Sequence, residues 1–215
     1  MPLIIGVDFD NTIVSYDGLM RSIAIDWGVP IGDAGKSKKQ IRDIIRGLSD
    51  GEILWQRLQT AAYGIRMDEA KPTAGVEEFF LICKELAIPI RIVSHKTKYP
   101  NLGEQKVDLR AAAMAWLVKQ GFVSEDGFGI ARTDVYFESS RAEKIARIRQ
   151  LEVTHFIDDL EETFSDPGFP ANVRKMLYSS DAPTGTEKIS TFASWMEIRD
   201  FFLSTKGRTR YIRQA

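Results

Sequence analysis

Four aspartates follow two short apolar runs that are typical of buried strands. Asp8 and Asp10 come after the first run, and the adjacent pair Asp158 and Asp159 comes after the second. Open α/β sheets bind ligands beyond the carboxyl ends of their strands, so all four carboxylates gather at one edge if the two strands are neighbours. Such a cluster needs a cation to offset its repulsion. Because cysteine is absent from these segments and histidine is scarce, an oxygen-liganded ion such as Mg²⁺ fits better than zinc.

Two further side chains complete a candidate phosphoryl site. Ser94 ends a third strand-like run and could donate its hydroxyl to a phosphate oxygen, and Lys144 could supply the positive charge that a transferring phosphoryl group requires. The same charge could come from Lys96, Lys98 or Arg141. Other acids that could ligate the metal are Glu161, Glu162 and Asp166.

The elements that must position these residues alternate between strand and helix. Apolar runs predict strands at 3–7, 88–93 and 154–157, with weaker strands at 135–137 and 176–178. Amphipathic patterns predict helices at 76–86 and 193–203, and a helix that begins near Ser139. This alternation is typical of right-handed crossovers, so we expect an α/β fold with a doubly wound, Rossmann-like parallel sheet.

The alternation is interrupted between the first and second strands. Helical segments at 19–27, 38–48 and 53–63 follow one another without a strand, separated by glycine and proline. We therefore expect an α-helical cap insert at 16–71 and a core formed by 1–15 and 72–215. The basic segment 206–215 reads as a flexible tail.

Composition fits an ordinary globular protein. The chain has 215 residues, of which 44% are hydrophobic and 27% charged, and its net charge of −1 gives no general attraction to nucleic acid or membranes. No run reaches the roughly 18 apolar residues of a membrane span. The single cysteine, Cys83, cannot form an internal disulfide, which favours a cytoplasmic location, and its place in an amphipathic helix indicates packing. His155 is expected to be structural.

These motifs together resemble the haloacid dehalogenase superfamily, most of whose members are phosphatases. The matching segments are DFDNT at 8–12, Ser94 in IPIRIVSH, Lys144, and the acidic pair in HFIDD at 155–159. The resemblance extends over nearly the whole chain. It also explains the helical insert, since a helical cap commonly lies between the first and second motifs of this family.

The resemblance implies a role for each matching residue. Asp8 would be the nucleophile and a metal ligand, and Asp10 would serve as general acid and base while ligating the metal through its main-chain carbonyl. Asp158 would ligate the metal directly, and Asp159 through water or from the next shell. The phosphate oxygens would be held by Ser94, Lys144 and backbone amides near Phe9 and Asn11, and His95 would line the site.

The implied activity is Mg²⁺-dependent hydrolysis of a small phosphomonoester, such as a sugar phosphate or nucleotide, through an aspartyl-phosphate. Asp10 favours phosphate chemistry over dehalogenation, because a departing halide needs no proton. A phosphomutase or phosphotransferase, or a non-catalytic regulatory protein that binds phosphate or metal, stays open. A receiver domain of a signalling relay fits less well, because its acidic pair, phosphorylated aspartate and lysine follow another order. A further anionic group on the substrate is hinted at by Arg21, Arg42, Arg46 and Arg57.

Overall fold

A six-stranded sheet forms the centre of the computed structural model, which describes residues 2–32, 37–100, 107–181 and 189–204. Every neighbouring pair of its strands is parallel, and the spatial order is β5-β4-β1-β6-β7-β8. The strands are β1 (Ile5–Val7), β4 (Ile90–His95), β5 (Val135–Glu138), β6 (His155–Asp158), β7 (Arg174–Tyr178) and β8 (Ile189–Phe192). The expected doubly wound parallel sheet is confirmed.

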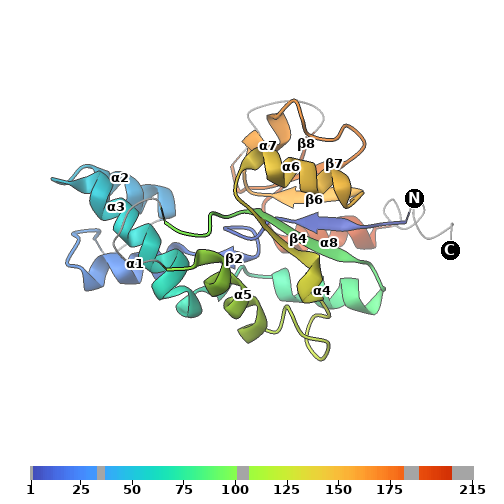
Figure 1. Cartoon of the computed structure of the whole chain (residues 1–215), viewed down its shortest axis with the longest axis horizontal. Coiled ribbons are helices and arrows are strands. Elements are labelled where there is room, and N and C mark those ends of the chain that lie inside the picture. Colours follow the sequence, from blue (N-terminus) through green and yellow to red (C-terminus); the bar gives the residue numbers. More distant parts are fainter. Residues whose placement is uncertain (1, 33–36, 101–106, 182–188, 205–215) are drawn as a thin grey trace.

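Helices cover both faces of this sheet (Figure 1). One face packs on α4 (Val76–Glu85) and α8 (Trp195–Leu203), and the other on α6 (Arg141–Gln150) and α7 (Glu161–Ser165). Helix α6 begins where Ser140 accepts a hydrogen bond from the Glu143 amide, as an N-cap does. The predicted helices at 76–86 and 193–203 are therefore present, whereas α7 and β8 were not anticipated.

The central position of β1 brings its carboxyl end between those of β4 and β6. Ile5 pairs with Ile90 on one side and with His155 on the other. Gly6 permits the close approach on the β6 side, because a Cβ there would lie 2.4 Å from Cδ2 of Phe156. The first strand is thus fixed from both sides, and the residues that follow it leave the sheet between two neighbouring strand ends.

A group of helices is inserted after β1, between the short strands β2 (Val14–Ser15) and β3 (Lys71–Pro72). These two strands pair antiparallel, so the chain enters and leaves the insert side by side. Figure 1 shows the inserted helices together at one end of the molecule. They are α1 (Asp17–Asp26), α2 (Lys38–Arg46), α3 (Gly51–Thr60), a π-helical turn η1 (Ala61–Ile65) and a 3₁₀ turn η2 (Met67–Glu69). The three helical segments predicted there are present, while the domain boundaries at 16 and 71 stay a prediction.

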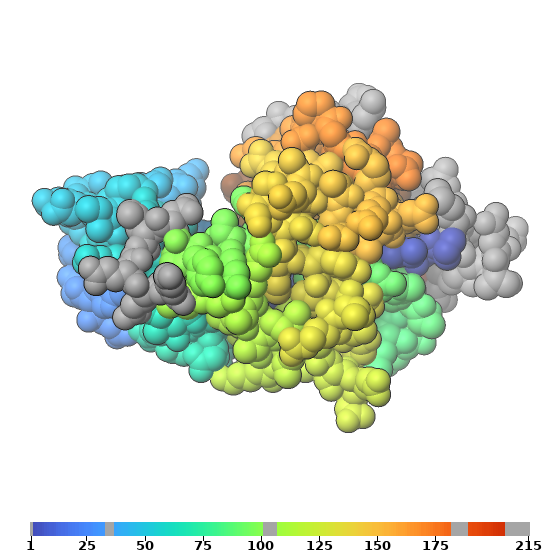
Figure 2. Space-filling model, viewed as in Figure 1, coloured from blue at the N-terminus to red at the C-terminus, as the bar shows by residue number. Residues whose placement is uncertain are grey.

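Helix α5 (Leu109–Lys119), which the sequence patterns did not reveal, joins the insert to the rest of the chain. Its Trp116 indole donates to the Ala70 carbonyl at 2.9 Å, and the Lys119 ammonium donates to the Asp68 carbonyl at 3.1 Å. Figure 2 shows the insert, in blue to teal, and the sheet domain as two lobes with a notch between the cyan helices and the yellow α6 region. Within the described ranges no helix is both long and apolar enough to cross a bilayer, and the tail at 206–215 lies outside them.

Candidate active site

Three carboxylates converge at the carboxyl ends of β1 and β6. The register of these strands places Val7 beside Ile157, and the Asp8 amide donates to the Ile157 carbonyl at 2.9 Å. Asp8, Asp158 and Asp159 each offer a carboxylate oxygen within 4.8 Å of the others. Asp8 and Asp158 are buried, with 4% and 0% of their surface exposed. The structure thus brings together three of the four aspartates singled out by the sequence.

Lys144 binds two of these carboxylates from the first turns of α6. Its ammonium donates to Oδ1 of Asp8 and to Oδ2 of Asp158, both at 2.6 Å. Burial alone lowers the pKa of Lys144, but the neighbouring charges of Asp158 and Asp8 outweigh it, so the pKa is raised and the ammonium persists. Lys98, by contrast, is exposed and 3.8 Å from Asp108, and Arg141 is exposed.

The three carboxylates of Asp8, Asp158 and Asp159 together carry more negative charge than the ammonium of Lys144 can offset. Burial raises the pKa of Asp8 to about 7 against the lowering effect of Lys144, with Asp158 and Asp10 adding to the rise. Burial followed by the charges of Asp8 and Asp158 raises the pKa of Asp159 well above its usual range. A divalent cation would relieve this repulsion, and carboxylate oxygens are the ligands that Mg²⁺ prefers. The donor set therefore fits the predicted metal.

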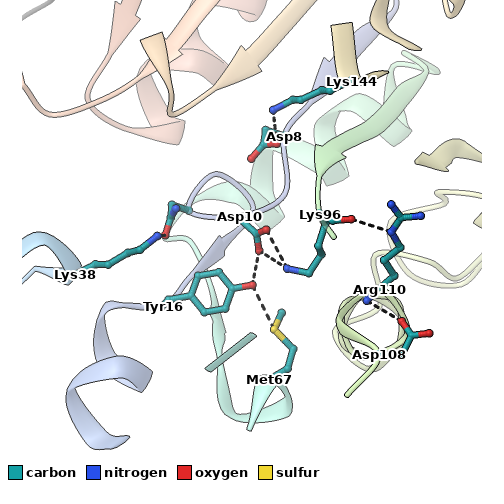
Figure 3. A network of polar contacts seen from close by, with 10 residues as sticks. Asp8, Asp10, Tyr16, Lys38, Met67, Lys96, Asp108, Arg110 and Lys144 are labelled. Atoms are coloured by element: carbon teal, nitrogen blue, oxygen red, sulfur yellow. Dashed lines mark hydrogen bonds and ion pairs between the residues drawn. The ribbon is translucent and has the colours of Figure 1, made fainter. Parts of the chain in front are cut away.

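The side chain of Asp10 does not belong to this group of three carboxylates. It has its own partners, which Figure 3 shows. Its Oδ1 accepts from the Tyr16 hydroxyl at 2.6 Å and from the Lys96 ammonium at 2.9 Å, and its Oδ2 accepts from the same ammonium at 3.0 Å. The Tyr16 hydroxyl is also 3.3 Å from the sulfur of Met67, so Tyr16 links Asp10 to a second residue of the insert. Ligation of metal by the Asp10 carbonyl stays a prediction.

Lys96 makes contacts through its side chain and through both of its backbone polar groups. Its ammonium lies 5.4 Å from the ring centroid of Phe9 and 5.1 Å from that of Tyr63, which are cation–π distances. Its backbone amide donates to the Glu138 carbonyl at 2.8 Å, and its carbonyl accepts from Nε of Arg110 at 2.8 Å. The sequence offered Lys96 only as a substitute for Lys144. The structure instead assigns the two lysines to different aspartates.

The remaining residues expected at the site divide into buried and exposed ones. Ser94 is 1% exposed near the end of β4, whereas His95 beside it is exposed. Phe9 is fully buried and packs edge-on against Trp116 and Phe137. The contacts of Ser94 and of the Phe9 amide with phosphate stay predictions.

The loop after Asp10 makes a tight turn in which Asn11 has a φ of 58°, in the left-handed region where asparagine is among the better tolerated residues. The amides of Ile13 and Val14 both donate to the Phe9 carbonyl, and the Trp195 indole donates to the Thr12 carbonyl at 3.1 Å. Helix α8 thereby braces the turn that carries the two N-terminal aspartates.

Sequence reasoning missed the part that Tyr16 and Lys38 play in this site, where both contact the ring of Tyr63. Tyr63 lies on the π-helical turn η1, a conformation that often marks functional sites. Lys38 begins α2, and its ammonium is 3.4 Å from Oδ1 of Asn11. The sequence contains no local signal for the contact of Lys38, because its partner Asn11 lies 27 positions away.

Several other side chains have structural partners. Cys83 is buried, and burial raises the pKa of its thiol to about 12, as expected of a packing residue. His155 is buried beside the Thr154 hydroxyl. Arg42 pairs with Asp43, and Arg46 with Glu52, on the surface of the insert. Those two arginines therefore give no support to a further anionic group on the substrate.

A cavity of about 300 Å³ lies beside the site, between the insert and the segment that follows β4. Tyr63, which covers the Lys96 ammonium, is part of its wall. The lining is mostly uncharged and polar, and consists of Glu52, Gln56, Gln59, Thr60, Tyr63, Thr97, Pro100 and Leu109.

Comparison with known proteins identifies the fold. No family model and no curated protein sequence matches the chain. Among solved structures, a haloacid dehalogenase-like family protein from Streptococcus pneumoniae is similar with a TM-score of 0.58 and 14% identity, covering 94% of this chain and 98% of that one. A HAD family hydrolase from Deinococcus radiodurans with bound phosphate and sodium gives 0.54 and 14%, covering 94% and 95%. A dehalogenase gives 0.58 and 11%, covering 95% and 98%. Identities this low show the fold alone.

Proposed function

We propose that this chain, which has the fold of haloacid dehalogenase superfamily hydrolases, is a Mg²⁺-dependent phosphomonoester hydrolase that works through an aspartyl-phosphate. The observation that carries the proposal is the arrangement of Asp8. Its buried carboxylate is bound to Lys144 and lies close enough to those of Asp158 and Asp159 for the three to ligate one metal ion. Two residues further on, Asp10 is held by a different lysine, Lys96.

The metal would be held by Asp8, Asp158 and Asp159, with the Asp10 carbonyl as a further expected ligand. When bound, it would supply Lewis-acid stabilisation of phosphoryl charge. Lys144 keeps Asp8 and Asp158 oriented through two charge-assisted hydrogen bonds. Ser94 and the backbone amides of the turn at Phe9 and Asn11 would hold phosphoryl oxygens.

Asp8 would act as the nucleophile. A carboxylate oxygen forms a bond to phosphorus while the bond from phosphorus to the leaving oxygen breaks, which gives the acyl phosphate. Asp10 donates a proton to the departing oxygen and then takes one from the water that attacks the intermediate, releasing inorganic phosphate and restoring Asp8. The contacts of Asp10 with Lys96 and Tyr16 fix the position of its carboxylate for both steps.

The substrate would be a small phosphorylated metabolite. Its leaving group would occupy the polar cavity between the insert and the β4 segment, which the helical insert would close as a cap. The lining is polar and mostly uncharged, and its one charged residue is the acid Glu52, which favours a hydroxylated leaving group over one with a second phosphate. The likeness to a dehalogenase does not favour halide chemistry here, because Asp10 is available to protonate a leaving oxygen and is held in place by a lysine.

A panel of phosphorylated metabolites and an aryl phosphate, assayed with Mg²⁺ and with EDTA, tests the proposal. We expect metal-dependent phosphate release that Asp8→Asn abolishes while circular dichroism and melting temperature stay close to those of the wild type. Asp126→Asn, at an exposed loop carboxylate, is the matched control and should keep full activity. Absence of turnover across the panel, or an active Asp8→Asn protein, would contradict the proposal.

A further inference from the structure

We propose that Lys38, on the helical insert, binds the phosphoryl group of the substrate together with the turn at Asn11. This inference rests on the proposed function and deepens it, because it adds a cation from the insert to a phosphate site otherwise built by the sheet domain.

A hydrogen bond fixes the backbone of Lys38, and its side chain points toward the turn at Asn11. Its amide donates to Oδ1 of Asp17 at 2.9 Å, which ties the start of α2 to the start of α1. Figure 3 shows the side chain extending from the insert toward the turn that carries Asp10. The ammonium reaches Oδ1 of Asn11 at 3.4 Å, near the upper limit for a hydrogen bond. An ammonium has three donors, so this long contact leaves capacity for a stronger acceptor.

Lys38 differs from the other two lysines of the site in its charge partners. Lys144 is committed to Asp8 and Asp158 at 2.6 Å, and Lys96 to both oxygens of Asp10. Among the residues that the structure describes, Lys38 has no carboxylate within ion-pair distance. It is the ammonium at this site whose charge is left for an incoming anion.

The surroundings nevertheless keep Lys38 charged and turned toward the carboxylates. Burial lowers its pKa, but Tyr63, Asp10 and Asp159 outweigh this effect and raise it. The ammonium also lies 5.5 Å from the ring centroid of Tyr63. Four aspartates face three lysines here, so a bound divalent cation would give the site an excess of one positive charge. A phosphoryl group would find that excess at Lys38.

Because Lys38 belongs to the insert and Asn11 to the turn after β1, a phosphoryl group between them would connect the two lobes. Ligand binding would then stabilise the approach of α2 to the sheet domain. The position of the insert would then depend on two parts of the substrate, the phosphoryl group and the leaving group.

Calorimetric titration with inorganic orthophosphate in the presence of Mg²⁺ tests this inference without turnover. We expect Lys38→Met to weaken phosphate binding by about 10- to 100-fold, the usual loss for a charged hydrogen bond. Lys38→Arg should recover part of that affinity. Lys39→Met, at the exposed neighbouring lysine, is the matched control and should bind phosphate as the wild type does. Circular dichroism and melting temperature establish that each variant is folded.

The outcomes separate the inference from the proposed function. Equal phosphate affinity for the wild type and Lys38→Met overturns the role of Lys38, even if Asp8→Asn abolishes hydrolysis. Loss of phosphate binding in Lys38→Met supports it, even if no phosphomonoester is turned over. A wild-type protein that binds no phosphate in the presence of Mg²⁺ would overturn it as well.

Discussion

Lys96 places one ammonium against both carboxylate oxygens of Asp10, at 2.9 and 3.0 Å. The two residues are 86 positions apart in the chain, and the lysine side chain is 3% exposed. A carboxylate held at both oxygens cannot rotate freely about its last bond. The proposed acid and base therefore has one orientation before any substrate arrives.

Lys96→Met should lower turnover of alkyl phosphates by about 10- to 100-fold, which is part of the roughly 10²- to 10⁴-fold that a positioned acid and base contributes. The first step should suffer much less with 4-nitrophenyl phosphate, because its leaving group needs little protonation. Rapid-mixing measurement of leaving-group release checks this. Lys98→Met, at an exposed lysine of the same segment, should behave as the wild type. Equal losses for both leaving groups would argue against an orienting role.

Mg²⁺ affinity should depend on pH through Asp8. Burial raises the pKa of this carboxyl to about 7, and the metal binds its ionised form. The dissociation constant should therefore rise about tenfold for each pH unit below 7 and level off above it. Calorimetry between pH 5.5 and 8.5, in buffers of different ionisation enthalpy, would show proton release at the acid end. A constant affinity over this range would show that Asp8 does not ligate the ion.

His155 should make the fold sensitive to acid. Burial, with a smaller contribution from Arg174, lowers its pKa to about 4 from an ordinary value near 6.5. Between these values the unfolded chain binds more protons than the folded one, so stability is lost as pH falls from about 6.5 to about 4. At pH 5 the loss should be about 2 kcal/mol relative to pH 7.

Asp8 acts on stability in the opposite direction over this range, because its pKa, raised to about 7, makes the folded state bind more protons than the unfolded chain. Urea unfolding at pH 7 and 5 should therefore compare the wild type with His155→Asn, which removes only the histidine contribution. His95→Asn, at the exposed second histidine, is the matched control for the substitution itself. An identical pH dependence for the wild type and His155→Asn would refute the assignment.

Gly6→Ala should destabilise the protein by about 1–3 kcal/mol, the usual cost of overpacking a core. The added Cβ would lie 2.4 and 2.9 Å from two ring carbons of Phe156 on the neighbouring strand. Gly18→Ala is the control, because a Cβ there meets nothing within 4 Å and alanine favours a helix. Thermal melts of both variants check the pair. A Gly6→Ala protein as stable as the wild type would mean that β1 and β6 do not pack as described.

The sequence was informative where residues that can act chemically follow the end of a predicted strand. Asp8, Asp158 and Lys144 could be placed together because apolar runs give strands, strand ends share an edge, and a phosphoryl site needs a cation. The fold class followed from the same alternation. These inferences need only short-range patterns and the geometry of parallel sheets.

Two kinds of feature lay beyond that reasoning. Helix α5 is rich in alanine and apolar along most of its length, so its buried stripe of Leu109, Ala113, Trp116 and Leu117 does not stand out from the exposed residues. The partners of Asp10 come from separate parts of the chain, because Tyr16 lies just before α1 of the insert and Lys96 lies just after β4. Such contacts depend on how the two lobes meet, which periodicity does not encode.

The central place of β1 also governs the order in which the protein can assemble during synthesis. Its partners in the sheet, β4 and β6, begin at Ile90 and His155, so the first strand leaves the ribosome long before either neighbour exists. Pairing across such separations is slow, and an unpaired apolar strand is prone to aggregate. The nascent chain would therefore benefit from chaperone protection of β1 until β6 has been translated.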